Sequence, residues 1–111
     1  MKFTVHQFNV KNHIVNGNFI DEKAERDYMD ATILGKVDSV VFLTSYEAVC
    51  EIEAADLDEV FEIGNIGPES KIKRFGRMHS ISVGDVIEND VHELFVVSDF
   101  GFKRLGEKEA A

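Results

Sequence analysis

The sequence predicts a small single domain of the α+β class, with an antiparallel or mixed sheet of about four to five strands and one or two helices packed on it. Most of the apolar segments alternate or run continuously, as in strands, and others have apolar residues three or four positions apart, as in helices. The chain has 111 residues, of which 44% are hydrophobic, so it can bury one core but has little room for a second lobe. We expect the domain to span residues 1–105 and residues 106–111 to form a frayed tail.

The first strand is expected at residues 2–8, where Phe3 and Val5 alternate with polar residues. One face of this strand should therefore contact the core. The residues that follow, 9–19, are rich in Asn and Gly and predict a loop or an irregular hairpin.

A second strand is expected at residues 46–54, because successive side chains of this segment alternate between two faces. The face toward the core would carry Ala48, Cys50, Ile52 and Ala54, and the outer face would carry Glu47, Val49, Glu51 and Glu53. Cys50 lies among apolar neighbours, and no sequence feature supplies a lowered pKa. We therefore expect a buried structural thiol rather than a nucleophile.

Residues 21–34 predict the first helix. Ala24, Tyr28 and Ala31 are four and three positions apart and would share its buried face. Asp21 is suited to the N-cap and Gly35 to the position after the last turn.

A second, shorter helix is expected to begin at Asp56, which has the spacing of a capping box with Glu59. Gly64 stands where we expect this helix to end. Its buried stripe would consist of Leu57, Val60 and Phe61.

The C-terminal part predicts two strands. A tight turn is expected at residues 82–85, followed by a strand, a turn at Asn89 and Asp90, and a long strand that includes the apolar run 94–97. Such a continuous apolar run is typical of a strand that is covered on both faces.

Asp99, Phe100 and Gly101 repeat the three residues that hold magnesium in protein kinases. The sequence lacks the glycine-rich phosphate loop, the paired strand lysine and the catalytic loop that kinase chemistry also requires. We therefore expect Asp99 to bind no catalytic magnesium, and Gly101 to permit a bend where the strand leaves the sheet.

We expect the strands and the second helix to share one hydrophobic core. Its members would be Phe3, Val5, Ile52, Leu57, Val60, Phe61, Ile81, Val83, Leu94 and Val96.

No set of residues predicts an enzyme. The carboxylates are numerous, but the sequence singles out no two of them for acid and base roles. The histidines have no metal-ligand spacing and are expected at the surface or half buried: His6, His13, His79 and His92. We therefore predict no catalytic residue, no metal and no cofactor.

Charge distribution is the most informative feature. The net charge is −9, and nine acids but no Lys or Arg lie between Val37 and Ser70. The acids that we expect on the strand and on the second helix are Glu47, Glu51, Glu53, Asp56, Asp58, Glu59 and Glu62. A basic loop at residues 71–77 follows, with Lys71, Lys73, Arg74 and Arg77.

Three interpretations of these charges remain open. In the first, the acids and the basic loop are ordinary solvated surfaces. In the second, the acids form a recognition surface for a basic protein that handles nucleic acid, in the manner of a DNA mimic. Alternatively, the basic loop makes the chain a nucleic-acid-associated module. The net charge of −9 disfavours direct nucleic-acid binding.

The C-terminal half resembles the YodL-like family in three motifs: LDEVFEIGN at residues 57–65, MHSISVGDVI at 78–87 and VVSDFGFKRL at 96–105. The resemblance covers roughly residues 46–105, and the chain has Ser98-Asp99 where the reverse order is more usual. It implies a small cytoplasmic domain that occurs on bacterial chromosomes, plasmids and phages, often beside genes that counter host defences. The family has no established catalytic residues.

Together these observations predict a noncatalytic accessory protein of a phage or mobile element. Such a protein would bind a host protein through the acidic surface and inhibit or redirect it. We expect a cytoplasmic location and no membrane association, because the chain has one cysteine, no secretory signal and no apolar segment of about 20 residues.

Overall fold

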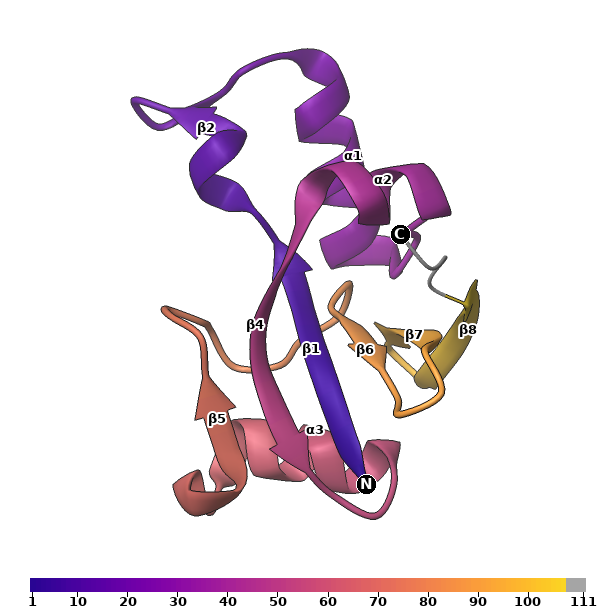
Figure 1. Ribbon diagram of the computed structural model, residues 1–111. Helices are drawn as coiled ribbons and strands as arrows, with labels where there is room; N and C mark the ends of the chain where they lie inside the picture. Colours follow the sequence, from indigo (N-terminus) through magenta and orange to yellow (C-terminus); the bar gives the residue numbers. More distant parts are fainter. Residues whose placement is uncertain (108–111) are drawn as a thin grey trace.

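The computed structural model describes residues 1–107 and confirms the α+β class (Figure 1). Its main sheet has six strands in the order β5-β4-β1-β6-β7-β8, and each neighbouring pair is antiparallel. The two edge strands, β5 and β8, are those that the sequence did not predict. The six strands are β1 (Lys2–Phe8), β4 (Tyr46–Glu53), β5 (Ile72–Arg74), β6 (Val86–Glu88), β7 (Glu93–Ser98) and β8 (Gly101–Glu107).

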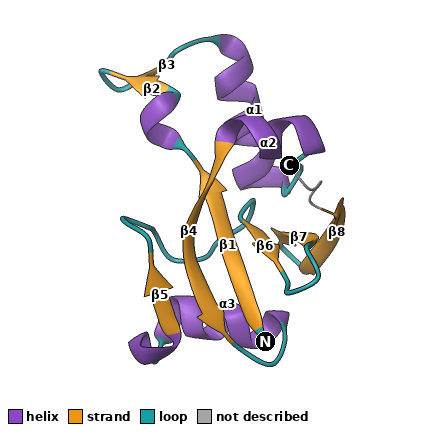
Figure 2. Ribbon diagram, in the orientation of Figure 1, coloured by secondary structure: helices purple, strands orange, loops and turns teal. Residues whose placement is uncertain are grey.

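The helices lie at two ends of the sheet, with α1 and α2 at one end and α3 at the other (Figure 2). Their bounds are α1 (Glu22–Leu34), α2 (Ser39–Ser45) and α3 (Leu57–Ile66). Short 3-10 helices at Val10–Asn12 and Glu69–Lys71 and a hairpin of β2 (Ile14–Val15) and β3 (Asn18–Phe19) complete the structure. Within residues 1–107, no helix has the length and apolar character needed to cross a membrane.

Asp21 and Gly35 bound α1 as the sequence predicts. The Asp21 carboxylate accepts a hydrogen bond from the backbone N–H of Ala24 at 2.7 Å, which satisfies a donor left free at the start of the helix. Gly35 has a φ of 64°, and its N–H donates to the carbonyl of Ala31. The helix buries Ala24 and Ala31, so its predicted face is confirmed.

The start of α3 is as predicted, but its buried side is not. Asp56 caps the helix by accepting a hydrogen bond from the N–H of Glu59 at 2.9 Å. Val60 and Ile63 are buried, whereas Phe61 is 38% exposed. The side of α3 that faces the sheet is therefore formed by Leu57, Val60 and Ile63, which are three positions apart. The prediction that Phe61 belongs to the core is wrong.

Gly64 lies inside α3 rather than at its end, because the helix continues to Ile66. A Cβ at Gly64 would lie 2.3 Å from Cδ1 of Ile81. The glycine thus allows close packing between the helix and the segment that crosses it, and does not terminate the helix.

A β-bulge changes the predicted faces of β4. Val5 pairs with Cys50 but His6 pairs with Ala48, so Val49 is the extra residue on β4. Ala48 is exposed and Val49 is buried, the reverse of the prediction. One inserted residue moves the side chains beyond it to the other face, and strict alternation in the sequence does not reveal this.

The apolar residues form two clusters on opposite faces of the sheet, not one core. On β6 and on β7, adjacent residues belong to different clusters: Val86 and Ile87, and likewise Val96 and Val97. Since adjacent strand residues point to opposite faces, α3 covers one face, and α1 and α2 cover the other.

The predicted core residues divide between these clusters. Phe61 is exposed, Leu57 and Val83 are half-buried, and the remaining ones are buried. The cluster beneath α3 contains Phe3, Val5, Ile52, Val60 and Ile81, and the cluster beneath α1 and α2 contains Leu94 and Val96.

The chain does not leave the sheet at Gly101. Asp99 and Phe100 form a two-residue turn, Ser98 pairs with Gly101, and β8 returns along β7. Gly101 has a φ of 126°, which favours glycine at this turn. The tail predicted at residues 106–111 therefore begins too early, because β8 includes residues 106 and 107. Residues 108–111 lie outside the described residues.

Two positions of α3 test which side of the helix is buried: Ile63, which is buried in the structure, and Phe61, which the sequence placed in the core. Ile63→Ala should lower the free energy of unfolding by about 3 kcal/mol, because it leaves a cavity under α3. Phe61→Ala, two residues earlier in the helix, should cost no more than about 1 kcal/mol, because Phe61 is partly exposed. Urea denaturation of both variants measures the difference, and equal losses would contradict the assigned phase of the helix.

Candidate functional site

The predicted acidic residues do not form one continuous surface. Glu47 lies at the other end of β4 from Glu53, about 20 Å away along the strand, and accepts a hydrogen bond from Asn9. Glu51 lies directly across from Lys73 on β5. Glu47 is therefore distant from the acids of α3, and the charge of Glu51 is offset by the neighbouring Lys73.

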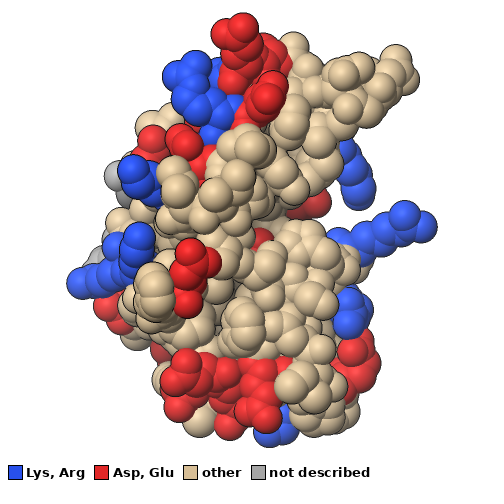
Figure 3. All heavy atoms as spheres, turned by 180° about the vertical axis from the view of Figure 1, so that it is seen from behind, with Lys and Arg blue, Asp and Glu red and all other residues tan. Residues whose placement is uncertain are grey.

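The other five predicted acids gather around the start of α3. They are Glu53, Asp56, Asp58, Glu59 and Glu62, which we call the acidic end. Figure 3 shows acidic side chains gathered at the lower edge of the molecule, where α3 lies in Figure 1.

The members of the acidic end differ in their contacts. Glu53 accepts a hydrogen bond from the N-terminal ammonium at 3.1 Å. Asp56 caps the helix, and the Glu59 side chain accepts from the N–H of Ala55 at 3.2 Å. Asp58 and Glu62 are exposed and form no ion pair within residues 1–107. They are thus the members best placed to contact another molecule.

An apolar groove of about 390 Å³ borders the acidic end. Asp56 and Asp58 stand at its edge, and Asn89 also lines it. Its apolar lining comes from the sheet and from the first turn of α3: Met1, Phe3, Leu57, Phe95 and Phe102. The arrangement combines hydrophobic contact area with negative charge beside it.

The basic residues are partly neutralised by acids. Lys73 and Arg74 lie on β5, and the Arg74 guanidinium donates hydrogen bonds to both carboxylate oxygens of Glu69. This contact lowers the pKa of Glu69. Lys73 lies opposite Glu51 on the neighbouring strand without forming an ion pair with it, and Lys71 and Arg77 are exposed and likewise form no ion pair inside the described chain.

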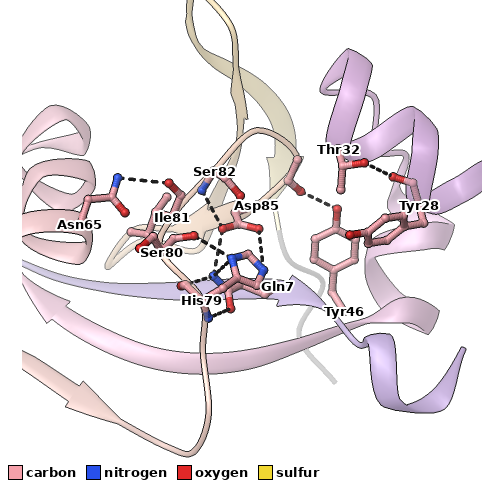
Figure 4. Close-up of polar contacts among 11 residues, drawn as sticks. Gln7, Tyr28, Thr32, Tyr46, Asn65, His79, Ser80, Ile81, Ser82 and Asp85 are labelled. Carbon is pink, nitrogen blue, oxygen red and sulfur yellow. Dashed lines mark hydrogen bonds and ion pairs between the residues drawn. The ribbon is translucent and has the colours of Figure 1, made fainter. Parts of the chain in front are cut away.

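A second site, which the sequence analysis missed, is a pocket of about 410 Å³ between α1 and the segment 79–85. We call it the Asp85 pocket, and Figure 4 shows the polar contacts of the residues at and beside it. Three aromatic side chains, Phe8, Tyr28 and Tyr46, line it together with polar residues. The Phe8 ring makes edge-to-face contacts with both tyrosines, at centroid distances of 5.3 and 5.7 Å.

Gln7 holds the polar side of this pocket together. Its Nε2 donates to the carbonyl of His79 at 2.9 Å and to Oδ2 of Asp85 at 3.0 Å, and its Oε1 accepts from the N–H of His79. Asp85 is 4% exposed, and its Oδ2 also accepts from the backbone N–H of Ser82 at 3.1 Å. Burial raises the pKa of Asp85 to about 6, although Ser82, His79 and Gln7 each act to lower it.

The groups in the pocket do not assemble into a nucleophilic site. Nε2 of His79 is 4.0 Å from Oδ1 of Asp85, beyond hydrogen-bond distance, and Nδ1 of His79 lies 2.7 Å from the carbonyl of Ser80. In residues 1–107, no hydrogen bond joins the Ser82 hydroxyl to the His79 ring. The same residues contain no group of three or more side chains that could hold a metal ion.

Gly84 fixes the turn against α1. It has a φ of 92°, and a Cβ there would lie 2.4 Å from the carbonyl oxygen of Ala31. Its own carbonyl accepts a hydrogen bond from the Tyr46 hydroxyl, and burial raises the pKa of that hydroxyl. The turn is therefore held between α1 and β4.

His6 is buried, and the prediction of a surface or half-buried position is wrong for this histidine. Nε2 of His6 lies 2.8 Å from one carboxylate oxygen of Glu88, and Nδ1 of His92 contacts the other oxygen. Glu88 is itself buried. His13 is half-buried, whereas His79 and His92 are exposed.

Cys50 is fully buried, as predicted. Burial raises the pKa of its thiol to about 11. A thiol that stays protonated at neutral pH is a poor nucleophile.

Comparison with known proteins finds no matching family model, no matching curated protein and no matching solved structure. The candidate sites therefore rest on the chemistry of this chain.

The raised pKa of Asp85 predicts a pH dependence of stability. The folded protein binds this proton more tightly than the unfolded chain, so its contribution is complete below about pH 4 and is lost as the pH rises through about 6. The free energy of unfolding of the wild type, relative to Asp85→Asn, should be about 1 kcal/mol higher at pH 5 than at pH 7. Urea denaturation at both pH values tests this, and a difference of the opposite sign would refute it.

The contact between Gly84 and α1 predicts a large effect of Gly84→Ala. The substitution combines an unfavourable backbone conformation with a clash, and should lower the free energy of unfolding by about 3 kcal/mol. Gly17→Ala is the matched control, because Gly17 also has a positive φ but no atom near a Cβ, so it should lose only about 1 kcal/mol. Equal losses in thermal or urea unfolding would show that the close packing is absent.

Proposed function

We propose that this protein acts by stoichiometric binding to another protein, without catalysing a reaction, and that the acidic end is its contact surface. The observation that carries this proposal is the position of exposed carboxylates on a capped helix at the edge of an apolar groove. A partner with an apolar side chain beside Lys or Arg residues would match both features.

The structural setting of these charges favours binding. Asp56 and Glu59 hydrogen-bond to backbone groups at the start of α3, so the helix that carries Asp58 and Glu62 is held firmly. Charges on a rigid element lose little conformational entropy when a partner docks, and their spacing is kept. An acidic tail would lose both advantages.

The resemblance to the YodL-like family supports a narrower form of this proposal. In it, the chain is a cytoplasmic accessory protein of a phage or mobile element, and its partner is a host protein that it inhibits or redirects. A host protein that handles nucleic acid has the basic surface that the acidic end requires.

A direct role for the basic loop in binding nucleic acid has less support. Arg74 is engaged with Glu69, and Lys73 lies opposite Glu51, so two of its four cations are offset by carboxylates. Phe75 is the exposed aromatic residue of this segment. One ring and two free cations make a weak platform for a nucleic-acid strand.

Charge reversal tests which surface makes the contact. Asp58→Lys with Glu62→Lys should reduce capture of the partner from bacterial lysate at least about tenfold, since attraction at the interface becomes repulsion. Folding should change little, because both side chains are exposed. Affinity capture with quantitative mass spectrometry measures the effect.

The matched control is Glu22→Lys with Glu25→Lys, which makes the same charge change on exposed residues of α1. It should capture the partner as the wild type does. If the α3 variant retained full capture while Lys71→Glu with Arg77→Glu abolished it, the basic loop would be the contact surface. Salt-dependent retention of the wild type on DNA or RNA would further support that alternative.

A further inference from the structure

The Asp85 pocket has no part in the proposed function, because its lining residues are not those of the acidic end or of the groove beside it. Residues far apart in the sequence build it: Phe8 ends β1, Tyr28 and Thr32 come from α1, Tyr46 begins β4, and Asp85 follows the turn. Its volume of about 410 Å³ lies in the range of small-molecule sites.

The carboxylate in this pocket lacks a strong positive partner. Both hydrogen bonds to the carboxylate of Asp85 go to Oδ2, from the neutral Gln7 amide and from the Ser82 N–H. Oδ1 lies 4.0 Å from Nε2 of His79, whose side chain is 56% exposed. A carboxylate that is nearly removed from water is costly when ionised unless a cation neutralises it.

Two hydroxyl groups of the pocket present only hydrogen-bond acceptors to a ligand. Thr32 and Tyr46 use their hydroxyl protons on the carbonyls of Tyr28 and Gly84, so the lone pairs of their oxygens remain available. The described residues that line the pocket include no Lys or Arg. A ligand that brings donors and positive charge would complement such a site.

We propose that the Asp85 pocket binds a small organic cation, with a guanidinium or primary ammonium group against the Asp85 carboxylate. The aliphatic part of this ligand packs against the aromatic side chains Phe8, Tyr28 and Tyr46. A guanidinium or ammonium group forms charge-assisted hydrogen bonds with a carboxylate, and aromatic rings attract cations.

Other classes of ligand fit less well. An anion would meet a buried carboxylate in a protein of net charge −9. A metal ion would need several ligating side chains, and the described residues contain no such group of three. An organic cation needs only one carboxylate and an apolar wall, which the pocket provides.

A titration with butylguanidinium, monitored by the backbone amide NMR signals of the ¹⁵N-labelled protein, tests the proposal at pH 7.5. We expect saturable shifts at residues 79–85, with a dissociation constant on the order of 1 mM for so small a ligand. Butylurea has nearly the same shape without the charge and should bind at least about ten times more weakly. Equal binding of the two compounds, or shifts confined to α3, would overturn the proposal.

Two variants place the ligand at the carboxylate. Asp85→Asn removes the charge with little change of shape and should weaken butylguanidinium binding at least about tenfold. Asp90→Asn makes the same change at an exposed position and should leave binding unchanged. Thr32→Met keeps the carboxylate but extends into the pocket, and it should weaken binding similarly even if Asp85→Asn folds poorly. Wild-type affinity in Asp85→Asn or in Thr32→Met would refute the assignment.

The pH dependence gives an independent check. Between pH 7.5 and pH 5.0, binding should weaken about tenfold, because Asp85 takes up a proton with a pKa of about 6 and loses the charge that holds the ligand. The other titratable groups around the carboxyl are His79, Tyr28 on α1, and Tyr46 and Cys50 on β4, where burial raises the pKa of both β4 groups. Equal affinity at both pH values would contradict a role for the carboxylate.

The cationic group can belong to a free small molecule or to an Arg side chain of a polypeptide, and N-acetylarginine amide separates these sources. Binding as tight as that of butylguanidinium supports a polypeptide side chain, whereas binding of butylguanidinium alone supports a free cation. Failure of both compounds overturns the proposal. None of these outcomes depends on the acidic end, so this site and the proposed function can fail separately.

Discussion

Hydrogen bonding of two polar side chains on the central strand organises much of the molecule. β1 is paired on both sides and five of its seven residues are buried, yet two of these are the polar His6 and Gln7. Buried polar groups need partners, and theirs come from the segment between His79 and Glu88. These hydrogen bonds hold the segment beside β1. As a result, Ile81 packs against α3, and Val86 and Ile87 pack into the clusters on the two opposite faces of the sheet.

The acids of α3 have two roles that are compatible. Asp56 and Glu59 satisfy backbone donors at the start of the helix, where negative charge is also favoured by the helix dipole. Asp58 and Glu62 take no part in these contacts and remain available at the surface. The residues that stabilise the helix thereby orient the residues that we assign to partner binding.

The sequence was a good guide where local chemistry decides the structure. The caps at Asp21 and Asp56 follow from short-range hydrogen bonds, and the central strands follow from their apolar content. It failed for α2, whose Val and Phe residues favour strands, although Asp38 caps it, and for the exposed edge strands. The acidic residues could be read directly, but the Asp85 pocket could not, since Gln7 meets His79 and Asp85 across 72 and 78 positions.

Both edges of the sheet carry two adjacent basic residues, Lys73 and Arg74 on β5, and Lys103 and Arg104 on β8. An unpaired edge is a template for strand addition, and aggregation often begins there. Arg74 and Arg104 are ion-paired with Glu69 and Glu93, so the like charges that an edge-to-edge contact between two copies would bring together are chiefly those of Lys73 and Lys103. Lysines on an edge strand disfavour strand addition, so part of the basic stretch that suggested nucleic-acid binding has a structural explanation at the edge of the sheet.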